Sequence, residues 1–304
     1  MRILALALFL PLLVSTAMAA QPEPQDVELH FLPQPGDKML QTVSFNMQMT
    51  MKVLPGQEMT EEQRHKLLEA TQKMGKGMST TMTMAVRTEA GEADAKGDYL
   101  LHVRGEGGQF KLHLADQPAQ DVPNPMGELE LDALTNVNKQ DFEILRVKSA
   151  QPALNDPKVL DSLAHGVLNQ AFGAMKGLEG RRLKIGDSVE MPLDLQMPMA
   201  QLPVQGHIKV SAIYTLTAIR RGIATFDTAI KMTMDMSGNE GQPKKVDITM
   251  SGSGAGKLEY RIADRLPLHH DMNATMHVEM QLPGQASTQM DMQMNTRSRT
   301  ERYR

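Results

Sequence analysis

Methionines at alternate positions are the residues of this sequence whose type and spacing could do chemistry. A thioether sulfur is a soft ligand that selects Cu(I) over harder ions. It is also a polarizable apolar group that adapts to irregular shapes. Three segments carry Met-x-Met-x-Met, at Met47, Met49 and Met51, at Met232, Met234 and Met236, and at Met290, Met292 and Met294. These methionines suit three roles: a closed core, a deformable surface for an apolar ligand, or a copper site.

The spacing of the methionines predicts strands and limits the copper role. Side chains at i and i+2 of a strand point to the same face and stand about 7 Å apart, so a Cu(I) site needs methionines from neighbouring strands or a histidine. His270 is in phase with Met272, as a ligand set requires, whereas His277 points to the opposite face from Met276. We therefore predict no resident cofactor or metal, with Cu(I) as the alternative.

The preferred role of the methionine faces is to line a surface for an apolar ligand. Val and Ile have higher strand propensity and lose less side-chain entropy on burial, so a sheet that needed only a core would use them more often. The predicted lining residues are Met47, Met49, Met51, Met82, Met84, Met232, Met234, Met236, Met276, Met280, Met290, Met292 and Met294. The alternative is a structural β protein whose core happens to be rich in methionine.

The composition excludes several function classes. The chain has 304 residues, 26 of them Met, none Cys and none Trp, with a formal net charge of −4. Without cysteine there is no disulfide, thiol nucleophile or thiolate metal site. Few aromatics and no basic surplus argue against nucleic-acid partners. We expect a non-catalytic protein whose partner is an apolar small molecule or lipid, or an envelope protein.

Two other features suggest a phosphate-binding or zinc site, but their residues do not fit either one. Ser251–Leu258 is rich in glycine, but it lacks the first glycine of a phosphate loop and the hydroxyl residue after the lysine, so we interpret it as a flexible turn. The 9 histidines include no His-x-x-x-His pair and no carboxylate-rich cluster, which argues against a zinc site.

The N-terminus predicts export. Arg2 precedes an apolar run from Ile3 to Val14 and a small-x-small end at Ala17-Met18-Ala19, which is the layout of a signal peptide over residues 1–19. The run is shorter than the roughly 20 residues that span a bilayer, and no second run of spanning length follows. We expect a periplasmic or secreted protein without a transmembrane segment after cleavage.

Alternation of apolar and polar residues predicts many strands and few helices. The fold class is mainly antiparallel β: curved sheets, half-barrels or a sandwich in two lobes, with two helices packed on the sheets. An extended leader covers 20–37, lobe 1 covers 38–150 with a short helix near 60–74, a connecting helix covers 151–177, and lobe 2 covers 178–304. One continuous sheet is the alternative. Prolines at 192 and 198 predict an edge strand, and Pro283-Gly284 predicts a hairpin turn.

The second half resembles an exported bacterial family catalogued only as a domain of unknown function. The matching pieces are Ile185-Gly186-Asp187-Ser188, Tyr214-Thr215-Leu216 through Ile219, Gly222-Ile223-Ala224, and the glycine-rich segment that leads into Leu258-Glu259-Tyr260. Many members look like lipoproteins and often have an aromatic residue after Gly-Asp-Ser. This chain has Val189 there and no cysteine for a lipid anchor. The resemblance implies a β-rich exported protein, and it offers no known activity to carry over to this chain.

Overall fold

A computed structural model describes most of the chain. The described residues are 25–55, 59–62, 64–66, 69, 77–114, 118–122, 129–137, 142–149, 178–198, 205–238, 246–281 and 287–303. The predicted signal segment 1–19, the connecting helix 151–177 and the Pro283-Gly284 turn lie outside them. The statements below concern the described residues.

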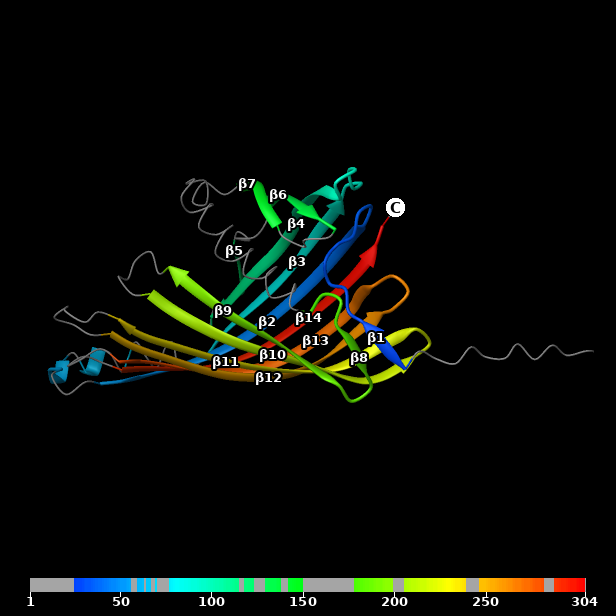
Figure 1. The fold of residues 1–304 in the computed structure, drawn as a ribbon. Coiled ribbons are helices and arrows are strands. Elements are labelled where there is room, and N and C mark those ends of the chain that lie inside the picture. Colours follow the sequence, from blue (N-terminus) through cyan, green and yellow to red (C-terminus); the bar gives the residue numbers. More distant parts are fainter. Residues whose placement is uncertain are drawn as a thin grey trace, which may run out of the picture.

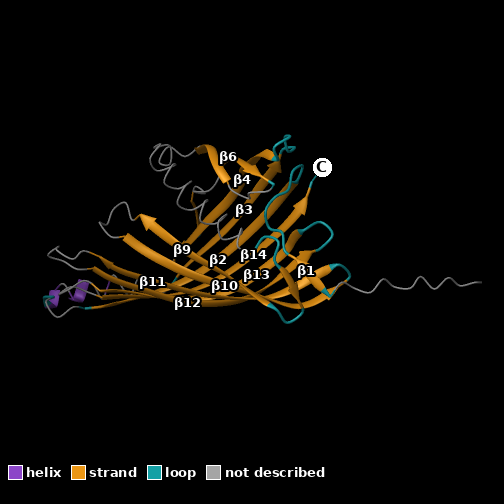
Figure 2. Cartoon of the chain, in the orientation of Figure 1, coloured by secondary structure: helices purple, strands orange, loops and turns teal. Residues whose placement is uncertain are grey.

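The described chain is mainly antiparallel β, as the alternation predicts (Figure 1, Figure 2). Its strands are β1 (Asp26–Glu28), β2 (Lys38–Leu54), β3 (Met78–Ala90), β4 (Asp98–Leu114), β5 (Gln120–Val122), β6 (Leu129–Asn136), β7 (Phe142–Ser149), β8 (Arg182–Lys184), β9 (Ser188–Pro198), β10 (Gln205–Arg220), β11 (Ile223–Gly238), β12 (Val246–Arg261), β13 (Leu266–Gln281) and β14 (Ser287–Arg302). Lys38 to Leu54 alternates strictly between apolar and polar side chains along its second half, which favours a long half-buried strand.

All the long strands belong to one sheet of 12 strands. Their order is β7-β6-β4-β3-β2-β14-β13-β12-β11-β10-β9, and β5 pairs with β4. Each half of the chain forms its own run of sequential antiparallel neighbours, and the pairing of β2 with β14 joins the two runs. The alternative of one continuous sheet therefore describes the strand pairing, and the described residues do not show a division into two lobes.

Two sequence predictions about strand placement are confirmed. β9, which contains Pro192 and Pro198, lies at an edge of the sheet, because proline cannot donate a ladder hydrogen bond. β13 and β14 pair antiparallel, as expected on either side of Pro283-Gly284.

Helical structure is sparse in the described residues. Within the predicted helix at 60–74, residues 61, 62, 64–66 and 69 are helical, and the structure does not describe a packing of this segment on the sheet. No described helix has both the length and the apolar character needed to cross a membrane.

The two halves open with the same turn. Gly36-Asp37 precedes β2 and Gly186-Asp187 precedes β9, with glycine φ values of 81° and 98°. The Asp37 carboxylate accepts a hydrogen bond from the backbone N–H of Gln34 at 2.8 Å, and the Asp187 carboxylate accepts one from the N–H of Lys184 at 2.9 Å. The two turns thus share a glycine with positive φ and an aspartate that accepts a hydrogen bond from the residue three positions earlier, so the repeated Gly-Asp pairs mark equivalent starts of two long strands.

The glycine-rich segment lies in the middle of β12, so its interpretation as a flexible turn is wrong. A Cβ at Gly254 would lie 2.8 Å from the Cβ of Ala274 and 2.8 Å from the carbonyl oxygen of Asn273, and one at Gly256 would overlap the backbone of Asp271. Glycine in a strand interior marks such close approaches of neighbouring backbones. Because these contacts lie on the side of the sheet that carries Met276, β12 and β13 fold toward that side.

This bend defines the two faces of the curved sheet (Figure 1). We call the side carrying Met47, Phe226 and Met276 the inner face, and the side carrying Gln48, Asp227 and His277 the outer face. The short β1–β8 ribbon lies on the inner side of the curve (Figure 1).

An apolar cluster fills one end of the inner face. Its members from β1, β8 and their flanking turns are Val27, Leu29, Phe31, Leu178 and Leu183, and they pack on Leu216, Phe226, Leu258 and Tyr260 of β10 to β12. We call this cluster the end plug. The leader, in which the sequence indicates one short strand near Val27 to Phe31, forms β1 and contributes buried core, with Val27 and Leu29 each 1% exposed.

Polar contacts of the leader tie the end plug to both halves of the sheet. The Tyr99 hydroxyl of β4 donates to the carbonyl of Pro33 at 2.6 Å. The Tyr260 hydroxyl of β12 accepts from the N–H of His30 at 3.0 Å. The Glu179 carboxylate accepts from the N–H groups of Phe31 at 2.8 Å and Leu32 at 3.2 Å.

Candidate functional site: the inner face

The strand register brings all the predicted lining methionines to the inner face. Met51, Met49 and Met47 of β2 lie opposite Met290, Met292 and Met294 of β14. The other predicted methionines pair as follows: Met276 with Met292, Met82 with Phe45, Met84 with Val43, Met232 with Gly252, Met234 with Met250, and Met236 and Met280 each with Ile248. Methionines from strands far apart in the sequence thus form cross-strand rows.

The methionine rows are partly open to solvent. Every predicted lining methionine whose side chain is described is half-buried. A small cluster forms where Ile248 and Val278 are buried, and Met234, Met276 and Met292 are among the half-buried side chains packed on it. The inner face in this region therefore presents apolar surface that the described residues do not seal.

The described inner face carries no charge over most of its width. The positions that face inward are every second residue of the strands from β10 through β3. They lie within 208–216 of β10, 224–236 of β11, 248–260 of β12, 270–280 of β13, 288–300 of β14, 39–53 of β2 and 78–90 of β3, counted from the first residue of each range. None of them is Asp, Glu, Lys or Arg; the next inner-face position of β14, at the end of the strand, is Arg302, which pairs with Asp37 at 2.9 Å. Burying an unpaired charge is costly, so this face suits an uncharged occupant.

A small polar zone lies on the inner face beside the end plug. Thr228 of β11 and Met272 of β13 lie on either side of Gly256 in the register, and His270 is the next inner-face residue after Met272. Thr228 is 2% exposed, and in the described structure neither its Oγ1 nor Nε2 of His270 has a hydrogen-bond partner. The rings of Tyr214 and His270 are in contact, with centroids 6.4 Å apart.

Burial governs the ionisation of this polar zone. It lowers the pKa of His270, because the charged imidazolium is poorly solvated there, and it raises the pKa of the Tyr214 phenol. Both side chains are therefore held in their neutral forms at neutral pH.

The positions of the two histidines considered as copper ligands are as the alternation predicts. His270 lies on the inner face in phase with Met272, and His277 lies on the outer face. Sequence reasoning overlooked Thr228. Its signal was available, since it is the polar residue in phase with Phe226 and Ile230 in an otherwise apolar stripe.

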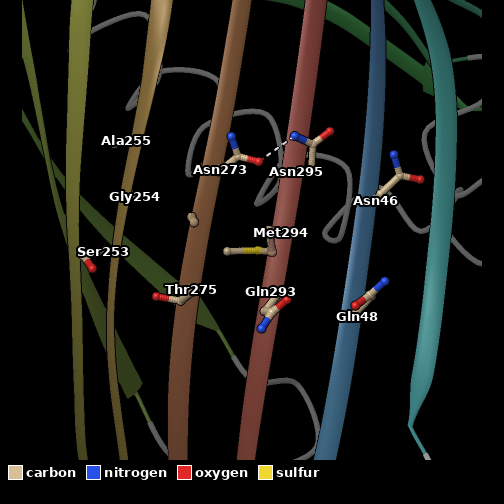
Figure 3. Close-up of a pocket in the computed structure, with 11 residues that line it drawn as sticks. Asn46, Gln48, Ser253, Gly254, Ala255, Asn273, Thr275, Gln293, Met294 and Asn295 are labelled. Carbon is tan, nitrogen blue, oxygen red and sulfur yellow. Dashed lines mark hydrogen bonds between the residues drawn. The ribbon is translucent and has the colours of Figure 1, made fainter.

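The outer face carries an open groove of about 550 Å³ over β12, β13, β14 and β2 (Figure 3). Its lining side chains are amides and hydroxyls, among them Asn46, Gln48, Thr275, Gln293 and Asn295. The amide of Asn295 donates to Asn273 at 2.7 Å. Most of these side chains are exposed, so the groove is a solvated polar surface without a buried group to fix a ligand.

An exposed histidine cluster lies beside this groove. Nδ1 of His277 lies 2.7 Å from Asp291 and its Nε2 lies 3.3 Å from Glu279. Hydrogen bonds that the His277 ring donates to these carboxylates raise its pKa. Over the described part of the chain, no group of three or more His, Asp or Glu side chains could hold a metal ion.

Comparisons with known proteins give no family. No protein-family model matches the chain, and no curated protein matches it. Solved structures with some likeness include OccK11 (OpdR) of Pseudomonas aeruginosa, at 9% identity and a TM-score of 0.22, covering 90% of this chain and 100% of that chain. OccAB4 of Acinetobacter baumannii matches at 7% identity and a TM-score of 0.25, covering 88% and 99%. OccK5 (OpdH) of P. aeruginosa matches at 6% identity and a TM-score of 0.26, covering 87% of this chain and 98% of that chain. At these TM-scores the likeness assigns neither a fold family nor a function.

Proposed function

We propose that this chain is an exported, non-catalytic protein that holds an apolar ligand on its methionine-lined inner face. The observation that carries the proposal is the continuous row of half-buried methionines across β2, β14 and β13, on a part of the inner face without charged side chains. The resemblance of the N-terminal residues to a signal peptide supports export to the periplasm or beyond.

The physical driving force is the removal of apolar surface from water. Each Å² of apolar surface buried contributes roughly 25 cal/mol, and half-buried thioethers such as those of Met49 and Met292 still have surface to bury. Methionine can change rotamer to fit different shapes at little cost. A ligand with an apolar body therefore gains binding energy here, whereas the polar outer face remains solvated.

A fluorescent apolar probe tests the proposal directly. N-phenyl-1-naphthylamine is titrated into the purified mature protein, and we expect saturable binding with an increase in fluorescence. Met49→Gln combined with Met292→Gln places two amides in one cross-strand row and should weaken binding at least fivefold. Gln48→Ala on the outer face is the matched control and should leave the Kd unchanged. Absence of saturable binding by the wild-type protein rejects the proposal.

Cu(I) binding is the second candidate, because the register brings together methionines of neighbouring strands, whereas those of a single strand are too far apart to share one ion. Met49, Met292 and Met276 lie in one row on three neighbouring strands, and strands in a sheet are about 4.8 Å apart. Anaerobic titration with Cu(I) in competition with a chromophoric chelator decides this candidate. It fails if the Met49→Gln, Met292→Gln protein competes for copper as well as the wild type.

A further inference from the structure

The inner face is divided along the strands into an apolar part and a polar part. At the far end from the end plug, the inner positions of β14 are Met290, Met292 and Met294, and nearer the plug they are Thr296, Ser298 and Thr300. Ser298 lies opposite His270 in the register. Hydroxyl and imidazole groups from several strands thus gather between the methionine rows and the end plug.

Two polar atoms of this zone are buried without a partner. Oγ1 of Thr228 and Nε2 of His270 have no hydrogen bond in the described structure, although each can donate or accept one. An unsatisfied buried polar group bears its full desolvation penalty and calls for an explanation. Thr228 is not needed for packing as threonine, since valine has the same shape without the unsatisfied hydroxyl.

The charge distribution restricts what could satisfy these atoms. The inner-face positions of β10 to β14 that surround Thr228 and His270 include no acidic or basic side chain. A carboxylate or phosphate placed here would lose its hydration without gaining a countercharge. A hydroxyl, ester or amide group needs only hydrogen bonds, and the zone supplies two unused ones.

The length of the apolar part restricts the remainder of the ligand. From Thr228 to Met236 along β11 the inner face extends about 26 Å at the usual rise per strand residue. Ile230, Met232 and Met234 occupy the positions between them. A single hydrocarbon chain of common membrane-lipid length fits this distance when extended.

We propose that the inner face selects long-chain amphiphiles with an uncharged hydroxyl-bearing head, whose head group binds Thr228 and His270 while its chain lies along the methionine rows. This inference rests on the proposed function and adds the chemical class and orientation of the ligand. The head group points toward the end plug, and the hydrocarbon end points toward Met234 and Met290. A monoacylglycerol or a long-chain alcohol has this chemistry.

Competition against N-phenyl-1-naphthylamine tests the inference. 1-Monomyristoylglycerol, myristate at pH 8 and n-tetradecane share one chain length and differ in the head. We expect the monoacylglycerol to displace the probe at a concentration at least tenfold lower than myristate or tetradecane. Thr228→Val removes one hydroxyl while keeping the shape, and it should weaken monoacylglycerol binding about three- to tenfold, the range for one lost hydrogen bond. Binding of tetradecane should not change.

Controls separate the inference from the proposed function. Thr275→Val makes the same change on the outer face of β13 and should leave all three competitors unaffected. If the probe binds but the three competitors displace it equally, or if Thr228→Val does not alter the ratio between monoacylglycerol and tetradecane, the head-group inference is wrong and the apolar site stands. If the probe itself does not bind, the proposed function is wrong. His270→Phe is the second variant and should reduce the same ratio.

Discussion

Gly256 of β12 lies against the backbone carbonyl of Asp271 on β13, with no room for a Cβ between the two strands. Gly252 and Gly254 lie along the same line, and a Cβ at Gly252 would come within 2.9 Å of the carbonyl oxygen of Thr275. This row of glycines allows the sheet to bend toward its inner face, so that the methionine rows on β13 and β14 and those on β11 face a common space. The proposed binding surface depends on that bend.

Gly256→Ala should destabilise the protein by about 1–3 kcal/mol, the usual cost of forcing extra atoms into a packed site. Alanine normally stabilises an extended strand position relative to glycine. A loss of stability in Gly256→Ala would therefore show that β12 and β13 approach too closely here for a Cβ. The measurement is the free energy of urea unfolding.

Gly91→Ala is the matched control for this prediction. Its added Cβ would meet its nearest atom, the carbonyl oxygen of Leu100, at an ordinary 3.4 Å. Its stability should equal or slightly exceed that of the wild type. Equal stability of the Gly256 and Gly91 variants would show that β12 and β13 do not approach as described.

The alternation of apolar and polar residues was enough to predict the strands and the apolar face of each one, and Pro192 and Pro198 were enough to predict the edge position of β9. Alternation is a local property, and each strand carries it independently. Strand order is not local. The pairing of β2 with β14, which places both halves in one sheet, depends on residues some 240 positions apart, and no pattern within either strand encodes that partner.

For the glycines of β12, the local composition itself predicted the wrong structure. In sequence, Gly252, Gly254 and Gly256 have the composition of a loop, because strand propensity disfavours glycine. Only the neighbouring backbone of β13 explains why small residues are required there. Thr228 interrupts the apolar stripe of β11 already in the sequence, but only its burial in the structure, at 2% exposure, distinguishes it from an ordinary surface threonine.

Glu179→Ala should destabilise the protein by about 2–5 kcal/mol. The side chain of Glu179 is 1% exposed and lies 2.6 Å from Nδ1 of His30. It also accepts the backbone N–H groups of Phe31 and Leu32. Removing it leaves these donors buried and unpaired, at about 1–3 kcal/mol for each unsatisfied group. Thermal and urea unfolding measure the loss.

Two variants calibrate the Glu179 prediction. Glu179→Gln retains one acceptor oxygen and should lose less stability than Glu179→Ala. Glu28→Ala removes an exposed carboxylate of the same ribbon that pairs with Arg182, and it should unfold as the wild type does, because exposed ion pairs contribute little. A wild-type unfolding curve for Glu179→Ala would contradict the end plug as described.

His270 should make the protein less stable as the pH falls. Burial lowers its pKa in the folded state below the ordinary value of 6.5, so between the two pKa values the unfolded chain binds a proton that the folded protein does not. Stability from this group is therefore complete above pH 6.5 and decreases as the pH falls below it. His270→Phe should reduce the loss of stability between pH 7.5 and 5.5, measured by urea unfolding.

The other titratable groups are present in both wild type and His270→Phe, so their contributions cancel in the difference between the two stability changes. His277 acts in the opposite direction, because nearby carboxylates raise its pKa, and it is present in both proteins. If the two proteins lose the same stability over this pH interval, His270 is solvated in the folded state and its burial is wrong.

Methionine oxidation should report on occupancy of the inner face. Half-buried Met49, Met276 and Met292 should form sulfoxides readily with hydrogen peroxide, whereas Met272, at 7% exposure, should react more slowly. 1-Monomyristoylglycerol should slow oxidation of the three half-buried methionines several-fold. Met59, which lies outside the sheet, serves as the internal control, and peptide mass spectrometry measures each site. Equal protection of Met59 would mean that the lipid acts as a general scavenger.

Native mass spectrometry of the protein purified from its own cell envelope shows whether a lipid occupies the inner face. We expect a discrete added mass that survives desalting, and organic extraction should release it as an uncharged long-chain lipid. Met49→Gln combined with Met292→Gln should lose this mass while remaining folded, whereas the outer-face variant Gln48→Ala should retain it. If the wild-type protein appears only at its bare polypeptide mass and also fails to bind N-phenyl-1-naphthylamine, the inner face does not bind apolar ligands.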